Sequence, residues 1–133
     1  VSKTTLLNRL RLARALAKKN PKALVPTAWG PWTAERYVSL YTPGSVEDIF
    51  PYHRLGGSWK ALKSVRVPLL VVLGQKDQYL DRSAADVMAT FKKQAISAPG
   101  FTGVVIPKAS HGFHKHQVQL TGVIRRWLQT LAI

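Results

Sequence analysis

Two continuous apolar runs mark the second half of the chain, at 67–73 and 101–106. Both contain β-branched residues and neither alternates with polar positions, which is typical of strands buried on both faces, as in parallel sheets. A helical pattern follows each run, through about residue 96 and from about residue 117 onward. The order strand, helix, strand, helix predicts an α/β fold, with a parallel βαβ unit and a closing helix over 66–133.

Each helical pattern predicts one apolar face toward the core. Asp81 or Ser83 can cap the first helix, because a short polar side chain accepts hydrogen bonds from the free backbone amides of the first turn. The expected core positions lie mostly three or four residues apart, as on one side of a helix. They are Ala84, Met88, Phe91 and Ala95 in the first helix, and Leu120, Ile124, Trp127, Leu128 and Leu131 in the second.

Residues 1–65 predict a helical, cap-like segment before this unit. The first twenty residues form an amphipathic pattern that ends at Asn20-Pro21, since proline disfavours a helical residue before it. The apolar positions of that pattern are Leu6, Leu10, Ala13 and Ala17. The stretch 21–32 contains three prolines and predicts an irregular loop.

Shorter helices are expected in the rest of this segment. Thr33 can cap a helix that runs through about Tyr41. The S-x-x-D pattern that begins at Ser45 predicts a helical turn as far as Phe50. A further short helix is predicted over 57–64.

The composition narrows the class of protein. The 133 residues suffice for one domain. A composition with 46% hydrophobic and 20% charged residues is typical of a globular protein and not of a disordered one. No cysteine is present, which excludes a disulfide framework, a thiolate metal site and a cysteine nucleophile. The longest apolar run is far shorter than the roughly 20 residues of a membrane helix. We therefore expect no membrane partner and a cytoplasmic location.

The formal net charge of +14 raises a second hypothesis, a non-catalytic basic module that binds nucleic acid or an acidic partner. The first twenty residues contain no acid, and six cations: Lys3, Arg9, Arg11, Arg14, Lys18 and Lys19. However, no zinc-ligand pairs, aromatic RNA-binding strand or zipper heptads accompany them. We therefore keep this hypothesis second and do not expect a nucleic-acid partner.

Titratable residues follow both predicted strands. Gly74-Gln75-Lys76-Asp77 comes after the first strand, and His111-Gly112-Phe113 comes soon after the second. Because the carboxyl ends of parallel strands meet at one edge of a sheet, Asp77 and His111 are expected to lie side by side. A carboxylate held against a histidine fixes its tautomer and stabilises the imidazolium that forms when the other ring nitrogen takes a proton.

Plainer interpretations exist for these residues. A G-x-x-D turn after a strand is common in α/β folds, and Asp81 is explained by a helix cap. A metal cluster is one interpretation of His111, His114 and His116. However, their spacing lacks the helical i, i+4 pair, and no carboxylate is near in sequence. We therefore expect no metal and no cofactor.

The two strand-and-loop stretches resemble the C-terminal portion of the α/β-hydrolase superfamily, in particular its esterase-like serine hydrolases. VPLLVVLGQKDQYL resembles the strand and loop that carry the acid, and FTGVVIPKASHGFHKHQ resembles the last strand and histidine loop. TAERYVSLYTPGSVEDIFPYH is similar to a helical excursion inserted by some members. The resemblance is specific over 66–133 and looser over 1–65, and it implies Asp77 as the triad acid and His111 as the triad base.

The nucleophile that this resemblance implies is missing. None of the eight serines lies in a G-x-S-x-G elbow, and no HGGG-like oxyanion sequence is present. We therefore expect the chain to be the C-terminal part of a hydrolase and to be inactive alone. A complementary N-terminal half or self-association is expected to cover the sheet, and the complete protein is expected to act on a small-molecule ester.

Three aromatic residues are candidates for contact with that substrate. One interpretation is that Trp29, Trp32 and Tyr79 line an acyl or aromatic pocket. Packing between helices and a sheet is the alternative use of such side chains. The sequence leaves both interpretations open.

Overall fold

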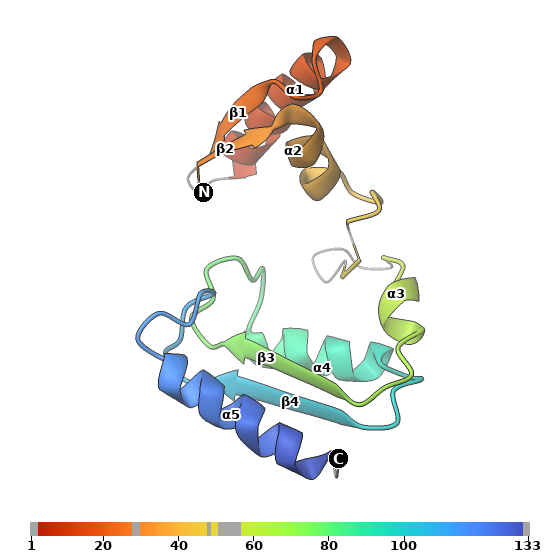
Figure 1. The fold of residues 1–133 in the computed structure, drawn as a ribbon, viewed down its shortest axis with the longest axis vertical. Helices are drawn as coiled ribbons and strands as arrows, with labels where there is room; N and C mark the ends of the chain where they lie inside the picture. The colour runs from red at the N-terminus through yellow and green to blue at the C-terminus, as the bar shows by residue number, and fades with distance from the viewer. Residues whose placement is uncertain (1–2, 28–29, 48, 51–56, 132–133) are drawn as a thin grey trace. The chain divides into compact units, whose positions relative to one another are not determined.

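The computed structural model describes residues 3–27, 30–47, 49–50 and 57–131. The chain forms two compact units, residues 1–49 and 50–133 (Figure 1). In this part of the chain, no helix combines the length and apolar character needed to cross a membrane. The result is a mixed α/β structure with two small sheets, one of them a parallel pair.

The first unit contains two helices and a β-hairpin. Helix α1 spans Lys3–Lys19 and helix α2 spans Ala34–Tyr41, with Thr33 as the N-cap whose side chain accepts from Arg36 N. Both helices were predicted and are confirmed. Their core with the hairpin consists of Leu10, Ala13, Val25, Ala34 and Tyr37.

The loop predicted over 21–32 is wrong, because strands β1 (Leu24–Thr27) and β2 (Gly30–Thr33) pair there as an antiparallel hairpin. Pro26 and Pro31 face each other in the register. Proline cannot donate to a ladder, but a two-stranded ribbon consists only of edge strands, where proline is tolerated. The prolines therefore did not prevent pairing.

The helical turn predicted from Ser45 to Phe50 is described only in part: Val46 and Glu47 lie in a turn, and Ile49 and Phe50 are not helical. Ser45 Oγ donates to the carbonyl of Ser39 at 2.5 Å, which joins this residue to α2. Gly44 precedes it with a φ of +78°, a conformation that suits glycine. Asp48, which belongs to the predicted pattern, lies outside the described residues.

The second unit is a parallel strand pair between two helices. It contains α3 (Lys60–Lys63), β3 (Leu69–Gly74), α4 (Ala84–Gln94), β4 (Phe101–Ile106) and α5 (Gln117–Thr130). The predicted strands, helices and parallel pairing are confirmed, although α3 is shorter than expected. Ser83, and not Asp81, caps α4, because its hydroxyl accepts from Asp86 N.

Helices α4 and α5 cover opposite faces of the strand pair (Figure 1). A side chain added at Gly103 would meet Met88 of α4, whereas the neighbouring Thr102 and Val104 lie beside Val123 of α5. The main core lies on the α4 side and is formed by Trp59, Leu62, Val87, Phe91 and Ala95. Leu62 of α3 and the preceding Trp59 belong to this core, and the compact unit spans residues 50–133.

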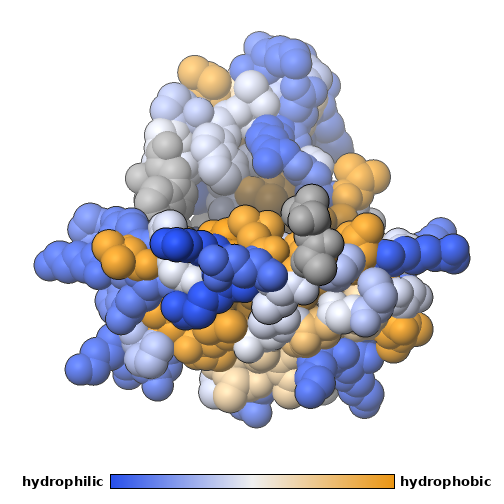
Figure 2. Space-filling model, turned by 60° about the horizontal axis from the view of Figure 1, so that its bottom comes forward, coloured by the Kyte–Doolittle hydropathy of each residue, from blue (hydrophilic) through white to orange (hydrophobic). Residues whose placement is uncertain are grey.

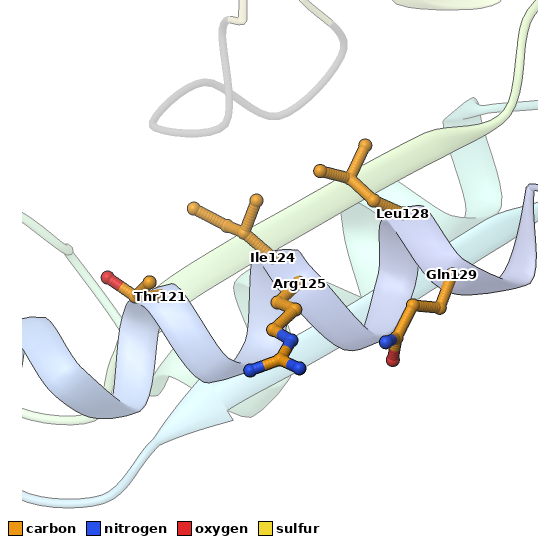
Figure 3. A pocket seen from close by; sticks show the side chains of 5 residues that line it. All are labelled: Thr121, Ile124, Arg125, Leu128 and Gln129. Carbon is orange, nitrogen blue, oxygen red and sulfur yellow. The ribbon is translucent and has the colours of Figure 1, made fainter.

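Two burial predictions are wrong. Strand β3 was expected to be buried on both faces, but Leu69 to Leu73 are all half-buried, since two strands leave much of the sheet edge open. On α5 the buried residue is Val123, whereas Ile124 and Leu128 are 40% and 47% exposed. Figure 3 shows Ile124 and Leu128 projecting to one side of α5, and Figure 2 shows apolar surface among charged side chains.

Candidate active site

The parallel register brings the acid loop and the histidine loop together. Gly74, the last residue of β3, is level with Ile106, the last residue of β4. Backbone hydrogen bonds then continue past the strand ends, from Gln75 N to the Ile106 carbonyl (2.9 Å) and from Lys76 N to the Ala109 carbonyl (2.8 Å). The two loops are thus joined through their main chains before any side chain contributes.

Glycine is required at position 74 by this close approach. A Cβ built on Gly74 would lie 2.5 Å from the Ala109 carbonyl oxygen and 2.6 Å from that of Ser110. Asp77 N donates to the Gly74 carbonyl at 3.2 Å and closes a tight turn, which turns the chain back at the strand end. The G-x-x-D spacing therefore has a local physical basis.

Asp77 and His111 meet as predicted. The Nδ1 atom of His111 lies 2.9 Å from Oδ2 of Asp77. The carboxylate is only 6% exposed and the imidazole is 58% exposed. Because a carboxylate only accepts hydrogen bonds, Nδ1 is the donor in the neutral ring and Nε2 carries the lone pair that can accept a proton.

The other oxygen of the Asp77 carboxylate is held by Tyr79. Its backbone N–H donates to Oδ1 at 2.9 Å, so each carboxylate oxygen has a partner. The Tyr79 ring packs edge-on against the His111 ring, with centroids 4.9 Å apart and planes at 82°. Tyr79 therefore restrains both members of the pair and forms one wall beside the imidazole.

Two glutamines that the sequence analysis did not single out join the loops further. Gln75 Oε1 accepts from Lys108 N at 3.0 Å, and Gln78 Oε1 accepts from His111 N at 3.3 Å. The only signal for them in the sequence was their position beside the G-x-x-D turn. They hold the main chain of the histidine loop, whereas Asp77 holds the imidazole itself.

The histidine loop has an unusual backbone. Lys108, Phe113 and Lys115 have φ values of 59°, 53° and 63°, in the left-handed region that non-glycine residues seldom adopt. Such conformations persist where surrounding contacts impose them, and they cluster at functional sites. Here the Gln75 side chain binds Lys108 N, so a loop contact holds one of the three in place.

The remaining predicted residues have other surroundings. Trp32 belongs to the first unit, where it stacks on Tyr41 with centroids 6.3 Å apart, and Trp29 lies outside the described residues. Asp81 is paired with Arg82 at 2.9 Å. His116 Nδ1 donates to the His114 carbonyl at 2.9 Å.

In the described ranges, the pair is not part of a cluster of metal-ligating side chains. Within them, no three His, Asp or Glu side chains converge as ligands for an ion. A surface hollow of about 420 Å³ is bordered by Thr121, Ile124, Arg125, Leu128 and Gln129, all on α5, and it includes neither Asp77 nor His111 (Figure 3). The candidate site is a buried carboxylate paired with an exposed imidazole at the end of the sheet.

Comparisons with protein-family models, with curated proteins and with solved structures found no significant match to this chain.

Proposed function

We propose that the chain supplies the acid and the base of a Ser-His-Asp triad in an esterase-like hydrolase of the α/β-hydrolase type. The 2.9 Å contact between His111 Nδ1 and Asp77 Oδ2 carries this proposal. It lies where open parallel sheets bear their reactive groups, outside the carboxyl ends of the strands. The serine is supplied by polypeptide outside these 133 residues.

The burial of the two groups fits these roles. Asp77 is shielded from water and is positioned to orient His111, while the exposed imidazole is accessible to a reactant. In the proposed reaction Nε2 accepts the serine hydroxyl proton as the serine oxygen bonds to the ester carbonyl carbon. The same proton then passes to the departing alkoxide, which leaves an acyl-serine and a neutral histidine. Water next bonds to the acyl carbon and gives a proton to Nε2, and the serine oxygen takes that proton as its bond to the acyl carbon breaks and the acid is released.

The edge of β3 that faces away from β4 favours pairing with an added strand. Leu69 N donates to the carbonyl of Gly100, just before β4, and Gln75 N donates to that of Ile106, at the end of β4. The alternate residues Leu70 and Val72 therefore direct their backbone groups to the opposite edge of β3. No strand in the described part of the chain pairs with that edge. A strand added there would end in a loop beside Asp77, which is where a complementary half could present the serine.

Ester hydrolysis by the assembled protein tests the proposal. The chain is combined with the polypeptide encoded upstream of Val1, and p-nitrophenyl acetate and butyrate are supplied as substrates. We expect hydrolysis and labelling of a serine by a fluorophosphonate only in the combined protein. Asp77→Asn should lower kcat by about 10⁴, as replacement of a triad acid does elsewhere.

His111→Ala should abolish hydrolysis, and His114→Ala, which changes an exposed histidine in the same loop, should not. The proposal is wrong if the combined protein has no fluorophosphonate-reactive serine. It is also wrong if the His111→Ala protein hydrolyses these esters as fast as the parent.

A further inference from the structure

Three cations of α1 form one exposed row. Arg11, Arg14 and Lys18 are all exposed and stand at positions i, i+3 and i+7, which share one side of a helix. Their Cα atoms span about 10 Å along the helix axis. The α1 sequence contains no acid, so the row has no opposite charge on its own helix.

The described acids of the first unit are engaged elsewhere. Glu35 pairs with Lys22 at 2.7 Å, and Glu47 pairs with Arg36. The first of these pairs also raises the pKa of Lys22, through the hydrogen bond and the charge of Glu35. Among the described residues, therefore, no acid of this unit is paired with Arg11, Arg14 or Lys18.

An aromatic surface adjoins this row. Arg14 Nη2 donates to Thr42 Oγ1 at 3.3 Å, which places the guanidinium beside the end of α2. The preceding residue, Tyr41, is 36% exposed and stacks on Trp32 at an interplanar angle of 21°. Proteins that bind single-stranded nucleic acid combine two elements. Cations contact the phosphate backbone, and aromatic rings stack on the bases.

We propose that this surface, formed by Arg11, Arg14, Lys18 and Tyr41, binds single-stranded nucleic acid without sequence preference. The cations contact phosphates, and the exposed part of the Tyr41 ring, which also packs against Trp32 and Tyr37, contacts a base. An anionic membrane fits less well, because an interfacial helix must offer its apolar side to lipid, whereas Leu10 and Ala13 of α1 are buried in the core of the first unit.

Fluorescence anisotropy with a labelled oligothymidylate of 15 nucleotides, measured on the full chain over a range of salt, tests this surface. Three phosphate contacts predict a slope of log K against log salt of about −2 for a single strand. Arg11→Gln/Lys18→Gln keeps the Arg14–Thr42 bond and should reduce the slope to about −0.7. Tyr41→Ala should weaken binding about tenfold with the slope unchanged, and Tyr41→Phe should retain affinity.

The matched control removes the same charge elsewhere. Lys92→Gln/Arg126→Gln changes two exposed cations of the second unit and should leave both affinity and slope as in the parent. Equal losses in the two double variants would show an effect of net charge and overturn the proposal. Absence of binding at 50 mM salt, or tighter binding to phosphatidylserine vesicles than to the oligonucleotide, would overturn it as well.

Discussion

Gly74 and Ala109 approach so closely that a single methyl group on the glycine would lie 2.5 Å from the carbonyl oxygen of the alanine. Gly74 is the last residue of β3 and Ala109 lies in the loop after β4, so this contact sets the distance between the Asp77 turn and the His111 loop. Neither obstructing atom is at the end of a flexible side chain, since the nearest are backbone oxygens of Ala109 and Ser110. A larger residue at 74 must therefore displace the loop.

Gly74→Ala is accordingly expected to destabilise the second unit by roughly 2 kcal/mol, the usual scale for overpacking a close contact. Urea unfolding followed by circular dichroism measures the change. Gly100→Ala is the matched control, because a Cβ there would meet nothing within 4 Å. Equal unfolding free energies for the two variants would contradict the role assigned to the Gly74 contact.

The two glutamines predict separate local effects. Gln78→Ala removes the acceptor of His111 N, and Gln75→Ala removes the acceptor of Lys108 N, so each should speed hydrogen exchange at one of these amides. Exchange measured by NMR on the full chain resolves the two sites. Gln119→Ala, on the exposed side of α5, should change neither amide. The assignment fails if either loop variant leaves its partner amide as protected as before.

The histidine tautomer can be predicted from the Asp77 contacts. In alkaline solution, where imidazoles are neutral, Nδ1 should carry the proton and Nε2 should be bare, because Asp77 Oδ2 only accepts. In Asp77→Asn the side-chain oxygen can keep the Tyr79 N–H, which leaves the amide NH₂ to donate to Nδ1. The proton should then move to Nε2.

Long-range ¹H–¹⁵N correlation spectra distinguish these tautomers directly and require no nucleophile or substrate. The exposed His114 serves as an internal reference, because its ring should give the same spectrum in both proteins. Finding the Nε2–H form of His111 in the parent chain would refute the proposed role of Asp77.

The candidate pair was predictable because it depends on topology and not on details of packing. Once 67–73 and 101–106 are parallel neighbours, the residues that follow them meet at one end of the sheet. The proximity of Asp77 and His111 follows from that order. The stabilising bonds from Gln75 and Gln78 did not follow, because a side-chain amide can bond in many directions and nothing in its spacing selects a partner.

The hairpin of the first unit was not predictable from the same rules. Pro26 and Pro31 disfavour strands, because proline cannot donate a backbone hydrogen bond. They are tolerated here because both strands of a two-stranded ribbon are edge strands and the two prolines are paired with each other. Helix α5 shows a related limit. The apolar face of α5 is wider than the surface that a two-stranded sheet can cover. The pattern alone therefore could not show that Val123 is buried while Ile124 stays exposed.

The first unit has its own test, which depends on pH. Tyr37 is 1% exposed, and burial raises the pKa of its phenol above the ordinary value of 10.0, against a smaller lowering by the charge of Arg9. Below pH 10 both folded and unfolded chains hold this proton, so Tyr37 makes no pH-dependent contribution there. As the pH rises further, the unfolded chain loses the proton first, and the free energy of unfolding must fall.

Tyr37→Phe keeps the ring and removes the ionisable group, so its free energy of unfolding should fall less between pH 9 and pH 11 than that of the parent. Lys22 also contributes to the alkaline fall, because Glu35 raises its pKa, but that contribution is common to both proteins and cancels in the difference. Parallel pH profiles for the parent and Tyr37→Phe would show that the phenol ionises equally in both states, which a ring sealed in the core does not permit.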